Sequence, residues 1–77
     1  MPNPELTFGE RAVGVSFNPS GDAAVAASKM HFAGAIEQLH PLREKSISQE
    51  QKRLASVAIT QAQTAQMWAT KALTWKD

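Results

Sequence analysis

Apolar residues recur at helical spacing in the first of two long stretches of the chain. They lie on one face of a helix with 3.6 residues per turn, and they are Val25, Phe32, Ile36 and Leu39. Lys29 stands in register between the first two of them. Pro41 disfavours a helical conformation for the residue before it. The pattern therefore predicts a first helix over residues 20–39.

The second stretch begins with a capping-box signal, in which Ser48 is followed three residues later by Gln51. No glycine or proline interrupts it up to Trp75, so we expect a second helix over residues 48–75, about 40 Å long at 1.5 Å per residue. Two adjacent stripes run along it: Leu54, Ala58, Gln61, Ala65, Trp68, Ala72 and Trp75, and beside them Ala55, Ile59, Ala62, Gln66, Ala69 and Leu73. This arc is wider than one shorter helix can cover, which predicts further contacts with other subunits.

The segment between the two helices, PLREKSI, is short and polar, as in connections between antiparallel helices. Residues 1–19 contain several prolines and glycines and read as an extended arm and turn. Within them, Val13, Val15 and Phe17 alternate with small residues, which is typical of a short half-buried strand or extended segment. We expect a mainly α protein, an antiparallel helical hairpin with a short extended N-terminal arm, as a single domain over residues 1–77.

Composition supports an oligomer. The chain has 77 residues, and much of its 43% hydrophobic content is alanine, which buries little area. It has no cysteine and only two histidines, so neither disulfides nor a metal centre is expected to stabilise so small a core. Association of identical subunits is the remaining route. We expect no cofactor.

Charge and hydropathy exclude other classes of protein. A net charge of +1 does not suggest a DNA-binding surface. No stretch approaches the roughly 20 apolar residues of a membrane span, and the first residues do not resemble a signal peptide. We therefore expect a cytoplasmic protein with neither DNA nor a membrane as its partner.

The candidate chemistry centres on the segment Asn18, Pro19, Ser20 and Gly21. Asn-Pro initiates a turn, Ser20 or Asp22 can cap the following helix, and Gly21 lets another molecule approach the backbone. The free N–H groups and positive dipole end of a helix start suit a phosphate. The alternative is a plain strand-to-helix turn, with Lys29 as a lysine that extends its amine to the solvent.

Two further pairs have the same ambiguity. Phe8 either fixes the arm to the chain's own helices or offers its ring to a base, and nearby Arg11 can bind phosphate in bidentate fashion. Trp68 and Lys71 lie on adjacent turns of one helix face. Trp68 either packs in a core or forms a ligand platform, and Lys71 pairs either with a carboxylate or with a phosphate. No catalytic triad, phosphate-binding loop or metal cluster is evident, which favours binding or assembly over catalysis.

The combination resembles a known family. VGVSFNPSG followed by a helix with V-x-x-x-K, and a second helix with A-x-x-A-Q-M-W-A-T-K-A, is similar to the hairpin domain of bacteriophage cyclic-nucleotide sponges, the small anti-CBASS and anti-Thoeris proteins. The resemblance covers residues from about Phe8 to Trp75. Longer relatives carry an N-terminal β-rich domain that this sequence lacks. The anti-CBASS branch presents a tyrosine near the first helix, whereas this sequence has none and offers Phe17 or Phe8 for stacking.

The resemblance implies a homo-oligomer, often a hexamer, that sequesters cyclic di- or trinucleotides or cyclised ADP-ribose derivatives without cleaving them, in the host bacterial cytoplasm. It implies that Phe8 and Asn18 meet the ligand, that Lys29 contacts phosphate, and that Lys71 provides a further basic group. The candidate ligand-binding residues are Phe8, Arg11, Phe17, Asn18, Pro19, Ser20, Gly21, Lys29, Trp68 and Lys71. The alternative is an oligomeric helical hairpin that recruits a protein and binds no nucleotide.

Overall fold

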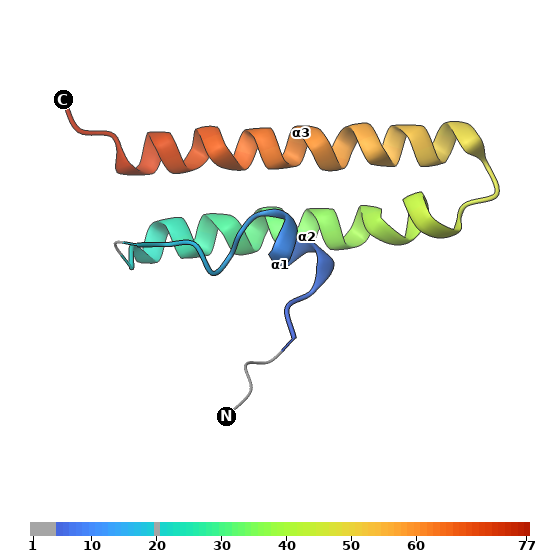
Figure 1. The fold of residues 1–77 in the computed structure, drawn as a ribbon. Coiled ribbons are helices and arrows are strands. Elements are labelled where there is room, and N and C mark those ends of the chain that lie inside the picture. The colour runs from blue at the N-terminus through green and yellow to red at the C-terminus, as the bar shows by residue number, and fades with distance from the viewer. Residues whose placement is uncertain (1–4, 20) are drawn as a thin grey trace.

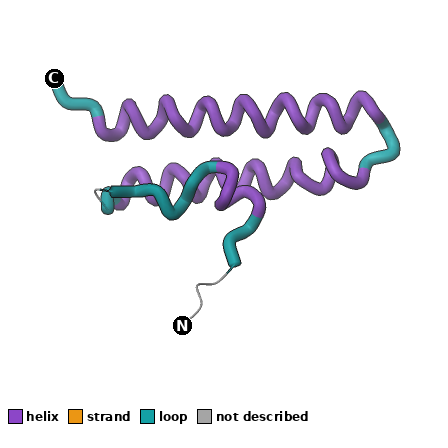
Figure 2. Tube along the Cα trace, viewed as in Figure 1, coloured by secondary structure: helices purple, strands orange, loops and turns teal. Residues whose placement is uncertain are grey.

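A computed structural model describes residues 5–19 and 21–77 of the chain. Two long helices, α2 (Ala23–Lys45) and α3 (Gln49–Thr74), lie side by side and antiparallel, and a short helix, α1 (Phe8–Ala12), packs on α2 (Figure 1). The described residues contain helices and loops and no strand (Figure 2). The mainly helical hairpin predicted from the sequence is confirmed.

The N-terminal segment departs from the prediction over residues 8–16, which form a helix and a turn, so the strand predicted over residues 12–17 is wrong. Residues 1–4 of the predicted arm lie outside the described residues. Thr7 caps α1 by accepting a hydrogen bond from the Glu10 backbone, 3.1 Å away, and the Glu10 carboxylate accepts the Thr7 N–H at 2.8 Å. This reciprocal capping box satisfies two donors that an isolated turn would leave free. After α1 the backbone turns over residues 13–16, with Gly14 at φ 65°.

The first long helix is displaced from the predicted range 20–39. It starts at Ala23, because the Asp22 carboxylate caps it, and it continues through Pro41 to Lys45. Proline removes the N–H that would bond the Glu37 carbonyl, which usually ends or bends a helix. The residue before Pro41, His40, packs on α1 by stacking its ring on Phe8. The helix continues through Pro41 beside this tertiary contact.

The second long helix lies close to its predicted range. Ser48 caps it by accepting the Gln51 N–H at 3.1 Å. The Gln51 side chain does not return to the Ser48 backbone, since it accepts a hydrogen bond from the Ser46 hydroxyl. The capping box is therefore only half formed.

The core lies where α1 and its turn meet both long helices. Its buried residues are Val13, Ala33, Ile36 and Ile59, and Phe8, Ala12, Val15, Phe32, Leu39 and Ala62 pack around them. Gln63 of α3 donates to the Ala12 carbonyl at 2.9 Å and joins α3 to the end of α1. The chain measures 46 × 38 × 12 Å, so it is about one helix thick.

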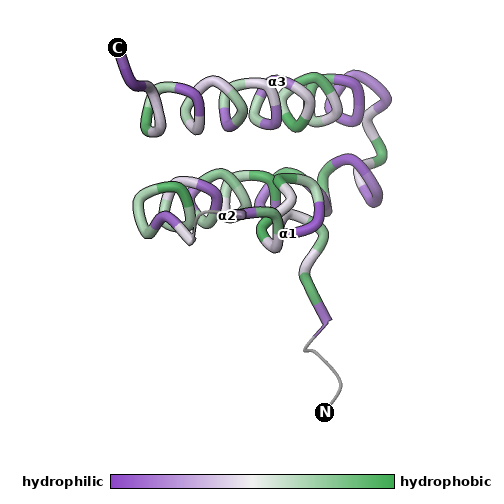
Figure 3. Tube along the Cα trace, turned by 60° about the vertical axis from the view of Figure 1, so that its left-hand side comes forward, coloured by the Kyte–Doolittle hydropathy of each residue, from purple (hydrophilic) through white to green (hydrophobic). Residues whose placement is uncertain are grey.

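One stripe of α3 faces α2 and the other faces outward. Ala55, Ile59 and Gln66 are buried against the hairpin, whereas Leu54, Trp68 and Trp75 of the neighbouring stripe are more than half exposed. Hydrophobic residues recur along both α2 and α3 (Figure 3). The predicted arc is thus only half covered within one chain.

Candidate functional site

The turn before α2 is fixed by the side chain of Asn18. Its amide donates to the Asp22 carbonyl at 2.9 Å, and its oxygen accepts the Asp22 N–H at 3.2 Å. The Asn18 carbonyl also accepts the Gly21 N–H at 2.9 Å. Pro19 is exposed beside it, and Ser20 lies outside the described residues. Asn18 therefore closes the turn with hydrogen bonds that a ligand would have to share or replace.

Gly21 occupies the position that needs glycine. Its φ is 63°, a conformation that other residues rarely adopt, and the space where a Cβ would stand is empty within 4 Å. The backbone here is accessible from outside, as the sequence predicted.

The start of α2 is not an open anion site. The Asp22 carboxylate accepts the N–H groups of Ala24 and Val25 at 2.8 and 3.1 Å. These are two of the donors that a phosphate would use. The prediction that Asp22 can cap the helix is confirmed, but the expectation of free helix-start amides is wrong, because the chain's own carboxylate occupies them.

Lys29 is buried within the hairpin. The residue is only 5% exposed, so the alternative of a lysine that reaches the solvent does not hold. Its ammonium donates to the carbonyl of Gly14 at 3.0 Å and to the carbonyl of Phe17. The ammonium also lies 5.5 Å from the centre of the Phe17 ring. Lys29 therefore connects α2 to the turn that precedes it.

A hollow of about 290 Å³ opens between this turn and the C-terminal half of α3. We call it the turn hollow, and it is lined by Val13, Gly14, Phe17, Lys29, Gln66, Met67 and Thr70. Phe17 is 72% exposed at its rim. The hollow brings together an exposed aromatic ring, on which a base can stack, and the buried Lys29 side chain.

A second, smaller hollow of about 240 Å³ follows on α3, and we call it the tryptophan groove. Its lining residues are Thr64, Met67, Trp68 and Lys71. The Lys71 ammonium lies 5.2 Å from the Trp68 ring centre and 5.9 Å from that of Trp75. Trp68 is 64% exposed, so it is not a core residue of the single chain. Because Met67 lines both hollows, they form adjoining parts of one surface.

Phe8 and Arg11 lie elsewhere, on α1. The Phe8 ring stacks on His40 with 4.0 Å between centroids, and the Arg43 guanidinium is 4.8 Å from its centre. Arg11 is exposed and donates to the Leu6 carbonyl at 2.8 Å. His40 and Asp22 are separated by about 27 Å along α2 at 1.5 Å per residue. Phe8 therefore cannot share a pocket with Asn18 within one chain.

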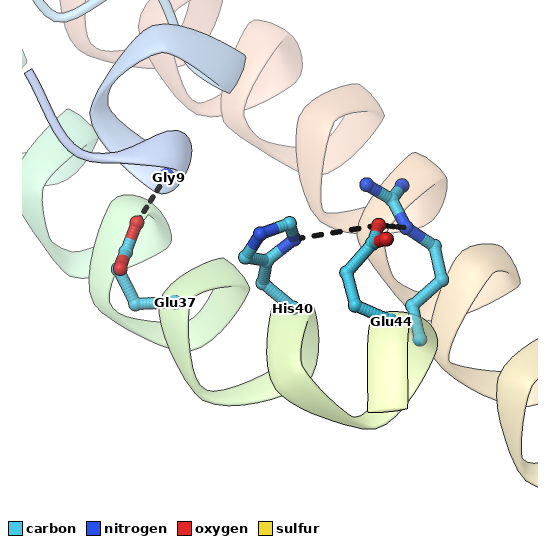
Figure 4. A network of polar contacts seen from close by, with 5 residues as sticks. Gly9, Glu37, His40 and Glu44 are labelled. Atoms are coloured by element: carbon cyan, nitrogen blue, oxygen red, sulfur yellow. Dashed lines mark hydrogen bonds and ion pairs between the residues drawn. The ribbon is translucent and has the colours of Figure 1, made fainter. Parts of the chain in front are cut away.

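The helix α1 is held to α2 by a polar contact at Gly9 (Figure 4). The Gly9 N–H donates to the Glu37 carboxylate. This backbone hydrogen bond lowers the pKa of Glu37, and contributions from Thr7, His40 and Arg11 act in the same direction. One turn further along α2, the His40 Nδ1 lies 3.9 Å from the Glu44 carboxylate. These contacts make the arm part of the folded hairpin.

The sequence analysis assigned two of the residues that line the turn hollow, Phe17 and Lys29, to the site. It missed the other five, which are Val13, Gly14, Gln66, Met67 and Thr70. Gln66 is 4% exposed and donates to the Thr70 hydroxyl at 2.7 Å. A signal was present, since Gln66 interrupts the buried stripe of α3 just as Lys29 interrupts that of α2. Two polar residues, each in register on an apolar stripe, meet at one hollow.

The described part of the chain holds no group of three His, Asp or Glu side chains placed to bind a metal ion. Nor is any helix in residues 5–19 and 21–77 both long enough and apolar enough to cross a lipid bilayer.

Comparison with known protein families gives a match over most of the chain. The family model described as "Acb2/Tad1, hairpin domain" matches residues 10–74. No curated protein and no solved structure matches the chain. The match spans α2, α3 and the turn that forms the hollow.

Proposed function

The chain belongs to the Acb2/Tad1 hairpin-domain family, that of the phage cyclic-nucleotide sponges with anti-CBASS and anti-Thoeris activity, and from this premise we propose that it binds and sequesters cyclic nucleotide immune signals. The ligand class comprises cyclic di- and trinucleotides and cyclised ADP-ribose derivatives. The protein holds the signal intact, in the cytoplasm of the host, and so blocks antiphage signalling. The family match carries this proposal, and the surface formed by the two adjoining hollows supports it.

The two hollows offer what a cyclic nucleotide requires. Phe17 at the turn hollow and Trp68 in the tryptophan groove are exposed aromatic rings on which bases can stack. Lys71 supplies an exposed positive charge for a phosphate. We assign the turn residues Asn18, Pro19 and Gly21 to the ligand backbone. Ser20, which lies outside the described residues, stays a candidate from the sequence alone. We assign the stacking role to Phe17 first, because its ring is the more exposed of the two.

We further propose that the working form is a homo-oligomer, a hexamer. The tryptophan groove is lined by α3 alone, and a hollow on one helix cannot enclose a ligand. The outward stripe of α3 leaves large apolar side chains exposed in a layer only 12 Å thick. A second copy over this stripe would bury them. It could also bring Phe8 and Arg11 of one subunit to the turn of another, which one chain cannot do.

A thermal-shift screen tests the ligand class. The panel holds cyclic di- and trinucleotides and cyclised ADP-ribose, with the linear dinucleotide and ADP-ribose as matched controls. A ligand at 100 times its Kd adds about 2.7 kcal/mol to the stability of the native form, which for a domain of this size raises Tm by on the order of 10 °C. We expect such a rise with at least one cyclic compound and little with its linear control. No rise across the panel would favour the alternative, a protein-interaction module.

Two measurements separate sequestration from catalysis and test the assembly. Heat denaturation of the complex should release the ligand intact, whereas a linearised product would identify an enzyme. Native mass spectrometry should report six subunits with retained ligand, and a monomer at micromolar concentration would refute the hexamer.

Substitution at the hollow tests the site. Phe17→Ala should weaken binding by about tenfold, since loss of one base–aromatic stack costs about 1–3 kcal/mol. The control is Ile47→Ala, because Ile47 is also an exposed apolar residue and lies in the loop between α2 and α3, away from both hollows. Equal Kd values for both variants would remove Phe17 from the site.

A further inference from the structure

The role of Lys29 follows from its surroundings in the hairpin. We infer that Lys29 is a positioning residue, which fixes the turn over residues 14–17 and so holds the Phe17 ring at the turn hollow, in place of binding the phosphate of the ligand itself. This inference rests on the proposed function for the part that concerns the ligand.

The Lys29 ammonium group is already coordinated within the chain. A lysine ammonium has three N–H donors, and two of them are used by the carbonyls of Gly14 and Phe17. The residue is 5% exposed. Lys29 lines the turn hollow, so a phosphate bound there must compete with these two carbonyls for the donors of the ammonium. Burial of an ammonium is costly unless it is hydrogen-bonded, so these two carbonyl contacts also hold the group in place.

Few other contacts orient Phe17. Its side chain is 72% exposed, so packing does not fix the ring. Its backbone is held by an N–H bond to the Gly14 carbonyl at 2.8 Å, the same carbonyl that accepts from Lys29. Gly14 itself has φ 65°. The ammonium therefore binds both ends of the turn that carries the ring, and it lies 5.5 Å from the ring centre.

A double-mutant cycle measures whether Lys29 acts through Phe17. The variants are Lys29→Met, Phe17→Ala and the double variant, and the probe is the cyclic compound of the panel that gives the largest thermal shift. We expect Lys29→Met to weaken binding about tenfold in the wild-type background and less than about twofold in the Phe17→Ala background, because contacts in one unit are not additive. Additive losses in the two backgrounds would overturn the inference.

The dependence of Kd on salt distinguishes positioning from direct phosphate binding. A lysine that neutralises a phosphate contributes about one ion to the slope of log Kd against log salt. We expect the slope of Lys29→Met to equal that of the wild type, and a slope lower by about one would identify a direct contact. The control is Lys45→Met, which removes the same charge from the exposed end of α2.

Amide exchange of the ligand-free protein provides a test that does not depend on any ligand. Loss of the ammonium should accelerate exchange of the Phe17 N–H by at least about tenfold relative to amides in the middle of α3. Unchanged exchange would refute the positioning role. If the wild type binds no probe, the proposed function fails, and this exchange rate still decides what Lys29 does. Should Lys29→Met fail to fold by circular dichroism, Lys29→Gln replaces it in each experiment.

Discussion

The contact between α1 and α2 makes Gly9 the residue whose replacement tests the folded arm most directly. A Cβ added at Gly9 would overlap the Ala33 carbonyl oxygen and would lie 3.0 Å from both the carbonyl carbon and the Glu37 Oε1. Ordinary van der Waals contact begins near 3.4 Å. Because the overlapped atom is backbone in the middle of α2, it cannot move aside. In Gly9→Ala, α1 must therefore lift away from α2.

The size of the effect follows from what α1 and its turn bury. Val13 directly follows α1 and is 5% exposed in the core. Burial of a valine side chain contributes about 1.5 to 3 kcal/mol. A glycine-to-alanine change within a helix returns up to about 1 kcal/mol. We expect a net loss of about 1 to 2 kcal/mol, or a fall in Tm of about 5 to 15 °C.

Urea denaturation followed by circular dichroism measures this loss. The matched control is Gly34→Ala, because Gly34 lies within α2 and a Cβ added there would have no atom within 4 Å. Alanine at that position should stabilise the helix by up to about 1 kcal/mol. The two substitutions are chemically identical and should have opposite signs. If Gly9→Ala were as stable as the wild type, α1 would not be docked on α2 as described.

Three further predictions concern the helix ends and the arm. The folded-state pKa of Glu37 is lowered, mainly by the Gly9 N–H. The ionised carboxylate therefore stabilises the fold above about pH 4.5, and this stabilisation is lost as the pH falls through the lower folded pKa. Urea midpoints measured against pH should show this loss, and Glu37→Gln should flatten the pH dependence. Asp22→Ala removes the α2 cap and should cost about 1 kcal/mol in the same assay, whereas Asp22→Asn should retain most of the stability. Pro41→Ala restores a helical N–H and should raise the free energy of unfolding, by up to the helix cost of proline, about 3 kcal/mol, and Tm should rise with it. An unchanged Tm would show that α2 is already relaxed around Pro41.

The hairpin could be predicted from the sequence because its signals are local. Ser48 and Asp22 cap the helices that follow them, and the apolar spacing on α2 and α3 reports which faces meet. The same stripes indicated that α3 has more apolar surface than α2 covers. The capping box of α1, Thr7 with Glu10, was equally local and could have been recognised.

The candidate site could be predicted only in part. The sequence placed Phe17 and Lys29 near one helix start, and the structure brings both to the turn hollow. It could not show that the Asp22 carboxylate occupies the helix-start amides, since a capping residue and an open anion site share the same sequence pattern. Nor could it show that Phe8 packs on His40, about 27 Å along α2 from the turn.

The sequence by itself thus determined the helices, their antiparallel pairing and the surplus apolar face, because these depend on spacing and on neighbours within a few residues. Only the tertiary structure decided the path of α2 through Pro41 and the docking of Gly9 on Ala33. It also decided the burial of the Lys29 ammonium beneath two carbonyls and its meeting with Gln66. These features depend on contacts between segments far apart in the chain, whose free energies outweigh local preference. The sequence marks Lys29 and Gln66 as interruptions of apolar stripes, but it does not show that the two meet.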